Sequence, residues 1–452
     1  MSPAFPSPVH PVRRRLRPAV LLLAVTAALV GSSTAVAVAD PGTDAATPAG
    51  RYYSITPTRI LDTRNSGGAI ANEATRIVDL TRALGGSASA VVINLTVTNP
   101  TWGGYLTAYP AGTAKPVASS LNFDKGQTRA NSVTVAVGQG TLQNRLAISA
   151  AVANNGRAHV IVDVLGWYGK GGGAAGSTYL PLASPVRLFD TRGSIGGLTT
   201  SYPKNIGIVT LDYGSAAMNK TITAAVMNIT VTNPRGLGNL TLWNGYGAPP
   251  LVSTLNFVPG QTVANLAVVP VRCSDSSCKT LTFSIKNNLS PYTQVIGDIS
   301  GVYTTPMRGG LVYQPVSPTR ITDSREHQPY AKLGAKGAGS SDVTRWMSAD
   351  TRALNVNLTA VKPSMSTYLT VYPSGTNRPV VSNINVTRGI VAANAAQVKI
   401  SRDGKFITAN STGWVDVVVD LQGMFVLDPV TSASVASTDG VVSGAAVSGT
   451  VS

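Results

Sequence analysis

The sequence is poor in charged residues, histidine and cysteine, and each shortage narrows what the protein can be. Charged residues make up 12% of the 452 residues, which does not fit a charge-rich disordered chain. Three histidines and two cysteines leave little material for zinc sites or histidine-based catalysis, and no HExxH, G-x-S-x-G or Walker-type loop occurs. Apolar residues, by contrast, reach 43%, enough for sizeable cores in roughly two to four domains.

Residues 1–39 have the features of a secretory signal peptide. A basic segment, Arg13–Arg17, precedes the apolar run Ala19–Val30, and the small residues Ala37–Ala39 follow. The apolar run is too short for a stable membrane span. We therefore expect an extracellular protein that starts near Asp40, has no transmembrane anchor and is associated with the cell wall or released.

Acidic residues are also scarce. Without the four signal arginines, 32 basic and 20 acidic residues give a net charge of +12. Such a balance favours anionic partners such as teichoic-type polymers, acidic polysaccharide, lipid surfaces or nucleic acid. The basic residues are spread along the chain, which favours loose surface adhesion over specific nucleic-acid binding.

The two cysteines, Cys273 and Cys278, are expected to form one local disulfide at a hairpin tip. A metal site built on both is the alternative, but no histidine lies near them in the sequence. We expect no metal and no cofactor. Because the closed loop is short, such a disulfide would stiffen one loop without holding the fold together.

Three copies of one unit account for most of the chain. An asparagine in a "NLTV"-like segment is followed 28 residues later by a second asparagine and nine residues after that by a third. These sets are Asn94, Asn122 and Asn131; Asn228, Asn256 and Asn265; and Asn357, Asn385 and Asn394. The arginines that open the units lie 128 and 133 residues apart, far more than the roughly 20–50 residues of solenoid repeats. We therefore predict domains in tandem.

Composition sets the expected boundaries. The predicted segments are repeat 1 (51–168), a glycine-rich linker (169–177), repeat 2 (178–303), a short linker (304–310), repeat 3 (311–426) and a disordered tail (427–452). The tail contains no LPxTG-type sorting signal, so covalent anchoring to a wall lacks support.

Within each unit the hydrophobic period is two. In "VVINLTVT", Ile93, Leu95 and Val97 share one strand face, and Asn94 and Thr96 share the other. Such runs, separated by clusters of Gly, Pro, Asn and Asp, indicate antiparallel strands, and no stretch has a convincing helical period with caps. The expected fold is all-β: three tandem antiparallel domains of β-sandwich or jelly-roll type, with a barrel as the alternative.

The motif "RILDTR" (Arg59–Arg64) recurs as "RLFDTR" (Arg187–Arg192) and "RITDSR" (Arg320–Arg325), and each unit ends on an aspartate in an apolar run. A buried acid needs a partner, so we predict a structural charge clasp between the first and last strands of each unit. A cation or ligand site and a catalytic carboxylate pair are the alternatives, although calcium would need more oxygen ligands. The clasp residues are Arg59, Asp62, Arg64, Asp163, Arg187, Asp190, Arg192, Asp298, Arg320, Asp323, Arg325 and Asp420.

A second strand pattern is typical of sugar binding. Tyr105, Thr107 and Tyr109 alternate along one expected strand, and flat rings beside hydroxyl and amide groups suit sugar rings. The same residues also favour strands or contacts between domains for purely structural reasons. The candidate ligand-binding residues are Tyr105, Thr107, Tyr109, Asn94, Thr241, Trp243, Tyr368, Thr370 and Tyr372.

Catalytic residues are difficult to find. His159 and His327 occupy non-equivalent places, and repeat 2 has no histidine. The remaining option is a carboxylate pair such as Asp62 with Asp163, as in glycosidases. Arginine neighbours lower the pKa of a carboxyl group, which suits an ion pair better than a general acid. We therefore expect no catalytic residues, with a carboxylate-dependent glycan hydrolase as the alternative.

The ordered string of motifs resembles a β-rich accessory module of exported actinobacterial cell-surface proteins. The order is RxxDTR, NLTVTNP, "YLTAYP", "SSLNFDKGQTRAN" and "VIVDVLGWY", and it covers nearly all of Arg51–Val426. The module occurs in tandem or appended to secreted enzymes such as cell-wall hydrolases. The resemblance implies a surface-directed accessory role and supplies no ligand. Repeat 3 departs from the pattern with "DSR", and repeat 2 lacks both tyrosines of "YLTAYP".

These observations together predict a secreted, non-catalytic protein that binds anionic or neutral cell-wall or extracellular polysaccharide through three repeated β-domains. Three copies would convert weak single-site affinity into avidity on a polymer. A structural or adhesive surface protein acting through a protein partner is the alternative, and a glycan hydrolase is the third.

Overall fold

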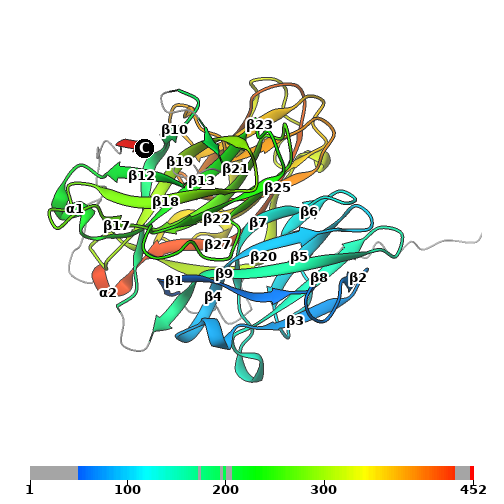
Figure 1. Cartoon of the computed structure of the whole chain (residues 1–452), viewed down its shortest axis with the longest axis horizontal. Coiled ribbons are helices and arrows are strands. Elements are labelled where there is room, and N and C mark those ends of the chain that lie inside the picture. The colour runs from blue at the N-terminus through cyan, green and yellow to red at the C-terminus, as the bar shows by residue number, and fades with distance from the viewer. Residues whose placement is uncertain (1–48, 172–174, 194–196, 200–205, 433–447, 452) are drawn as a thin grey trace, which may run out of the picture. The chain divides into compact units, whose positions relative to one another are not determined.

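The alternating sequence folds into antiparallel strands, and the prediction of an all-β protein is confirmed (Figure 1). The computed structural model describes residues 49–171, 175–193, 197–199, 206–432 and 448–451. The predicted signal segment, residues 1–39, lies outside the described residues. The described residues from Ala49 onward belong to one compact unit, so the three repeats are parts of a single body.

Each repeat contributes four strands to a sheet in the same order, and the strands of repeats 2 and 3 form one continuous sheet. In every copy the first strand of the repeat pairs with the last, the last with a middle strand, and that strand with a fourth. The strands, in sheet order, are β1 (Arg51–Asp62), β9 (Arg157–Gly171), β4 (Gly86–Thr98) and β7 (Arg129–Ala136) in repeat 1; β10 (Thr178–Asp190), β19 (Tyr292–Thr304), β13 (Ile222–Thr232) and β16 (Val263–Pro270) in repeat 2; and β20 (Leu311–Asp323), β27 (Asp416–Leu427), β22 (Thr351–Val361) and β25 (Ala392–Lys399) in repeat 3. We call these the inner sheets.

A second sheet accompanies each inner sheet, and we call it the outer sheet. Its strands, in sheet order, are β3 (Thr75–Asp79), β8 (Arg145–Val152), β5 (Gly104–Pro110) and β6 (Leu121–Phe123) in repeat 1; β12 (Ile206–Asp212), β18 (Leu281–Asn288), β14 (Gly238–Trp243) and β15 (Leu255–Phe257) in repeat 2; and β21 (Ala338–Asp342), β26 (Lys405–Asn410), β23 (Thr367–Pro373) and β24 (Ile384–Val386) in repeat 3. The short strands β2 (Ile70–Ala71), β11 (Leu198–Thr199) and β17 (Arg272–Cys273) pair with β9, β19 and β18.

The apolar face of each inner sheet packs with the apolar face of its outer sheet. In repeat 1, Ile93 and Leu95 of β4 share a buried hydrophobic cluster with Leu106 of β5 and Ile148 of β8. Repeats 2 and 3 have equivalent clusters of their own. The period-two pattern therefore predicts these core residues correctly.

The other face of each inner sheet is buried as well, which the sequence did not predict. Asn94 and Thr96 of β4 are 1% and 2% exposed, although their polar side chains resemble a solvent-facing stripe. Contacts with the neighbouring repeat cover this face. The prediction that Asn94 belongs to an open ligand-binding face is therefore wrong.

A fourth hydrophobic cluster lies where the three inner sheets meet. It is formed by Tyr52, Ala90, Val92, Tyr168, Tyr179, Ala224, Val226, Leu266, Val268, Tyr303, Leu311, Tyr313, Ala353, Ala395 and Phe425. Tyr52 and Tyr168 of repeat 1 contact Tyr303 of repeat 2, and the hydroxyls of Tyr168 and Tyr303 share a hydrogen bond. One glycine in each last strand makes room for a tyrosine: a Cβ on Gly166 would lie 2.3 Å from the Tyr52 hydroxyl.

The start of repeat 1 and the end of repeat 3 meet. The Arg51 guanidinium lies 2.8 Å from the carboxylate of Asp428, which is 2% exposed, and Gly50 pairs with Tyr313 of repeat 3. Repeats 2 and 3 are also joined directly, because β10 pairs with β20 through Tyr179 and Leu311. The strand β9 continues to Gly171, inside the segment predicted as a linker.

The tail is ordered in part. Pro429–Ser432 form a short helix, α2, and Ser448–Val451 form β28, which pairs antiparallel with β12. The prediction of a disordered tail is wrong for these residues, and residues 433–447 lie outside the described residues. Among the described residues, five further short segments are helical: α1 (Ala216–Asn219) and the single-turn helices η1 (Thr81–Ala83), η2 (Gly140–Leu142), η3 (Ser324–Glu326) and η4 (Thr344–Trp346).

The predicted disulfide between Cys273 and Cys278 is confirmed. Cys273 lies in β17, and the Cα atoms of the two cysteines are 4.7 Å apart.

Candidate functional site: a polar groove between repeats 1 and 2

The structure brings the predicted clasp residues together in all three repeats. In repeat 1, Arg59 of β1 lies opposite Asp163 of β9, and its Nε and Nη2 donate to the two carboxylate oxygens at 2.8 and 3.2 Å. The Arg187–Asp298 pair and the Arg320–Asp420 pair repeat this geometry, with Nε–Oδ1 distances of 2.8 and 2.9 Å. Each pair thus ties the first strand of a repeat to its last.

The second acid of the motif forms a local pair. Nε and Nη2 of Arg64 donate to the carboxylate of Asp62 at 2.9 and 2.5 Å, and Nη1 of Arg59 lies 3.5 Å from the same group. The hydrogen bonds from Arg64 hold the pKa of Asp62 below its usual value. Asp190 and Asp323 make the same contacts with Arg192 and Arg325, and their pKa values are lowered for the same reason.

The last-strand acids are perturbed in the opposite direction. Asp163 is fully buried, and this desolvation raises the pKa of its carboxyl group, against the opposing effect of Arg59. Burial raises the pKa of Asp298 and Asp420 in the same way. In repeat 2 the acid also accepts a hydrogen bond from the backbone N–H of Ser382 in repeat 3, at 3.2 Å. In repeat 2 the clasp is therefore part of the contact with repeat 3.

The hydroxyl of the motif has a structural role that the sequence did not reveal. The Oγ atoms of Thr63, Thr191 and Ser324 each accept from a last-strand backbone N–H, at 2.8, 2.9 and 2.8 Å. Each hydroxyl also contacts one side chain at a fixed place: His159, Gln294 or Asp416. Three chemically different residues serve at this place, and what they share is the capacity to accept a hydrogen bond.

The repeated asparagines join the repeats to one another. The carboxamide of Asn131 donates to Ser120 O of its own repeat at 2.6 Å and to Asn357 Oδ1 of repeat 3 at 3.0 Å. Its oxygen accepts from the backbone N–H of Ala395 in repeat 3 at 3.1 Å. Equivalent bonds run from repeat 1 to repeat 2 and from repeat 2 to repeat 3: Asn94–Asn265, Asn94–Ser253, Asn228–Asn394 and Asn228–Ser382. The contacts form a closed cycle, 1 to 2, 2 to 3 and 3 to 1.

One buried arginine interrupts this regular interface. Arg129 of β7 is 5% exposed and donates to Val391 O of repeat 3 at 3.5 Å, and it forms no ion pair among the described residues. Burial lowers the pKa of Arg129 to about 10. The equivalent positions in the other repeats are occupied by the buried apolar residues Val263 and Ala392.

The predicted aromatic and hydroxyl face is largely covered, contrary to expectation. Thr107, Thr241 and Thr370 are buried, because the loop after each strand folds back and accepts their hydroxyl hydrogens at Ala118 O, Val252 O and Val381 O. Tyr109, Trp243 and Tyr372 are 7%, 6% and 8% exposed. Tyr105 is half-buried, and Tyr368 is 37% exposed with the Arg378 guanidinium over its ring.

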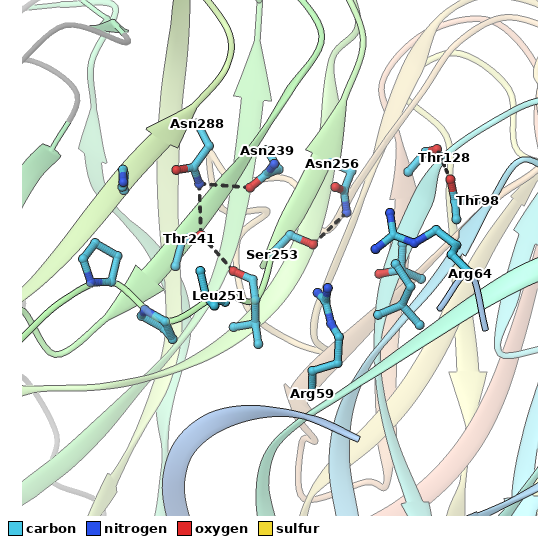
Figure 2. Close-up of a pocket in the computed structure, with 16 residues that line it drawn as sticks. Arg59, Arg64, Thr98, Thr128, Asn239, Thr241, Leu251, Ser253, Asn256 and Asn288 are labelled. Carbon is cyan, nitrogen blue, oxygen red and sulfur yellow. Dashed lines mark hydrogen bonds between the residues drawn. The ribbon is translucent and has the colours of Figure 1, made fainter. Parts of the chain in front are cut away.

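A polar groove of about 320 Å³ lies between repeats 1 and 2. Figure 2 shows Arg59, Arg64, Thr98 and Thr128 of repeat 1 on one side and residues of repeat 2 on the other. The repeat 2 side includes Asn239, Thr241, Leu251, Ser253, Asn256, Lys286 and Asn288. The arginines of the RILDTR motif therefore face the outer sheet of the next repeat, a combination that sequence reasoning missed.

Hydrogen bonds hold the polar side chains of the groove in place. Asn288 Nδ2 donates to Asn239 Oδ1 at 3.0 Å and to Thr241 Oγ1 at 3.1 Å, and Thr98 bonds to Thr128 at 2.9 Å (Figure 2). On the repeat 1 wall, Thr96 is 2% exposed, and no described residue forms a hydrogen bond with its hydroxyl. Such a hydroxyl can still bond to a group that enters the groove.

An exposed aliphatic side chain lies at the rim of the groove. Leu251 is 95% exposed, and the equivalent residues Val117 and Val380 are 90% and 85% exposed. Each follows a proline in the loop that covers the outer sheet. Apolar side chains so exposed at the same place in three copies contribute nothing to the core. The thrice-repeated proline–aliphatic pair is the sequence signal that could have revealed them.

The groove differs from its two counterparts by symmetry. Asn239 stands where Tyr105 and Tyr368 stand in the other repeats. By strand pairing with Thr241, Thr107 and Thr370, Lys286 stands where repeats 1 and 3 have Ser149 and Ala409. Repeat 2 thus presents a short amide and a long cation where the others present an aromatic ring and a small side chain.

A second hollow, of about 360 Å³, belongs to repeat 3 alone. It is lined by Ile321, His327, Gln328, Pro329, Asp342, Thr344, Arg345 and Trp346. The guanidinium of Arg345 lies over the Trp346 ring. The other repeats have no tryptophan or histidine at these places, so this hollow is not a shared feature.

Comparison with known proteins assigns no family. The sequence matches no protein-family model and has no significant similarity to a curated protein. Within the described part of the chain, no helix has the length and apolarity needed to span a bilayer. The same residues include no group of three or more His, Cys, Asp or Glu side chains that could hold a metal ion.

Proposed function

We propose that this protein is exported and binds cell-surface or extracellular polysaccharide without transforming it. The resemblance to accessory modules of exported actinobacterial proteins supports a surface-directed role. The net charge of the predicted mature chain, +12, favours attachment to anionic wall polymers.

The observation that carries the proposal is the composition of the groove between repeats 1 and 2. Its two walls offer carboxamides, hydroxyls and guanidinium groups, and its rim offers the exposed side chain of Leu251. A sugar ring presents the matching pair of surfaces, because its hydroxyls hydrogen-bond and its C–H faces pack against apolar groups. The hydrogen bonds that fix Asn239 and Asn288 reduce the ordering needed on binding.

The acids near the groove support a non-catalytic role. Asp62 and Asp163 are both bound by arginines, and the lowered pKa of Asp62 disfavours its use as a general acid. The pKa of Asp163 is raised, but its side chain is 0% exposed and is held by Arg59, so it has no access to a substrate in the groove. The buried hydroxyl of Thr63 faces His159, a pairing that could suggest a nucleophile and its base. Gln294 replaces the histidine in repeat 2, so acceptance of a hydrogen bond explains the position better than catalysis does.

We also infer that each repeat is a two-sheet β-sandwich, since its hydrophobic cluster takes residues from both the inner and the outer sheet. Three equivalent boundaries between repeats then carry an exposed aliphatic tip each. Binding one polymer chain at more than one boundary would raise the overall affinity through avidity.

Co-sedimentation with purified actinobacterial cell walls and insoluble polysaccharides tests the proposal. The protein of residues 40–452 is compared with a triple variant Val117→Ser, Leu251→Ser and Val380→Ser, at low and high salt. Val430→Ser is the matched control, because Val430 is also exposed, at 76%, and lies in α2. We expect binding that survives high salt, is weakened at least fivefold in the triple variant and is unchanged in the control.

Other outcomes would contradict the proposal. Binding abolished by salt and insensitive to the triple variant would indicate a purely electrostatic coat. Assembly that rises with protein concentration and ignores added sugars would favour the structural or adhesive alternative. Release of soluble sugars during incubation would favour a hydrolase.

A further inference from the structure

We propose that the groove between repeats 1 and 2 recognises an acidic group, a carboxylate or a phosphate, on the polysaccharide. This inference rests on the proposed function and assigns a ligand chemistry to one of the three boundaries between repeats.

The charges around the groove are unbalanced in favour of cations. Arg59, Arg64 and Lys286 line it, and the neighbouring acids are Asp62 and Asp163. Both acids are already engaged by the two arginines. Lys286 forms no ion pair among the described residues, so one positive charge is left uncompensated at the groove.

Free donors accompany that charge. Arg64 uses Nε and Nη2 on Asp62, and no described residue accepts a hydrogen bond from its Nη1. The ammonium group of Lys286 carries three donors and no acceptor. Thr96 also lines the groove, and its buried hydroxyl has no hydrogen-bond partner among the described residues. An anionic oxygen is the group that accepts from several such donors at once.

The combination of Lys286 with Asn239 is confined to one boundary. A tyrosine occupies the position of Asn239 in repeats 1 and 3, and Ser149 and Ala409 occupy the position of Lys286. The short Asn239 leaves the space that the ring would fill, and Lys286 supplies the charge beside it. The three boundaries therefore have different chemistry although they share one fold.

Titration calorimetry with soluble oligosaccharides tests this inference on the protein of residues 40–452. The probes are an oligogalacturonate, its methyl ester and a polyol-phosphate oligomer. The variant Lys286→Gln removes the charge and keeps much of the side-chain length. The control Lys220→Gln makes the same charge change at an exposed lysine of repeat 2 that does not line the groove.

We expect Lys286→Gln to weaken binding of an acidic probe five- to tenfold, to reduce its salt dependence and to leave the methyl ester unaffected. Lys220→Gln should change binding of each probe less than twofold. A second variant, Asn239→Tyr, should weaken acidic probes by filling the groove while the melting temperature stays within about 2 °C. Tighter binding of the uronate probe or of the phosphate probe identifies which acidic group the groove binds.

The failures of the two proposals are distinguishable. If the oligogalacturonate and its methyl ester bind equally well and Lys286→Gln does not change either affinity, the proposed acid-binding site is wrong and polysaccharide binding still stands. Equal losses from Lys286→Gln and Lys220→Gln overturn it as well, since diffuse charge would then explain the affinity. No binding of cell walls or of any probe overturns the proposed function itself.

Discussion

Replacing Asn131 by alanine tests whether the three repeats unfold as one body. The carboxamide of Asn131 is fully buried and makes three hydrogen bonds, to Ser120, Asn357 and Ala395. Its loss leaves buried groups of two repeats without partners, and each such group costs about 1–3 kcal/mol. Allowing for partial rearrangement, we expect the free energy of unfolding to fall by about 4 kcal/mol.

The size of the shift in melting temperature then indicates how many residues unfold together. Unfolding entropy is about 2.1 cal/mol/K per residue, so about 380 residues unfolding together give about 0.8 kcal/mol/K and a shift of about 5 °C. A single repeat of about 120 residues unfolding alone would give about 0.25 kcal/mol/K and a shift of about 16 °C. The shared aromatic cluster and the closed cycle of contacts favour one transition and the smaller shift.

Calorimetry and urea unfolding provide the measurement. The control is Asn65→Ala, because Asn65 is exposed and an exposed substitution changes stability by no more than about 0.5 kcal/mol. A melting temperature for Asn131→Ala equal to that of the unmodified protein would refute the role of the asparagine cycle. Three separate transitions would refute the single body.

Three further predictions concern buried or paired charges. Asp163→Asn should lower the free energy of unfolding by about 3 kcal/mol, which urea unfolding measures. This value is near the low end for breaking a buried ion pair, because the remaining Arg59 can still reach water. Asp62→Asn should lower it by about 1 kcal/mol at pH 7. Arg64 lowers the folded-state pKa of Asp62, so the Asp62 carboxylate stabilises the fold above about pH 4 and loses this effect as pH falls. The difference in free energy of unfolding between Asp62→Asn and the unmodified protein should therefore shrink between about pH 5 and pH 2. Arg129→Val should leave stability unchanged or raise it by about 1–3 kcal/mol, because it removes a buried charge that forms no ion pair with any described residue; a lower melting temperature would contradict this reasoning.

Strand positions and the core were predictable because they depend on local alternation. Ile93 and Leu95 face the core of repeat 1 as their spacing predicts. The clasp was predictable for a related reason: an aspartate inside an apolar strand needs a cation, and the same arginines recur with it in each copy.

The alternation of polar and apolar residues did not predict that the second face of each inner sheet is buried. Asn94 and Thr96 have the polarity of a solvent-exposed face, and nothing in a single strand shows that another repeat will cover it. Asn94 is tolerated there because the backbone carbonyl of Ser253 and the carboxamide of Asn265 satisfy its side chain. Those partners lie more than 150 residues away in the sequence.

The groove was missed because its two walls belong to different repeats. Arg64 and Lys286 come from opposite walls and have no local sequence relation. The substitution of Asn239 for tyrosine was visible as a departure from the repeat pattern. Its meaning depends on knowing which surface faces that position.

The ion pair between Arg51 and Asp428 has a consequence for how the chain can be connected. Because the start of repeat 1 and the end of repeat 3 lie side by side, a short peptide that replaces the residues after Asp428 could join them, and new ends could be opened between β9 and β10. Such a circular permutant would begin with repeat 2 and end with repeat 1. The groove between repeats 1 and 2 would then form between the last and the first parts of the chain to leave the ribosome. Its folded geometry should be preserved, while the order in which its two walls are synthesised is reversed.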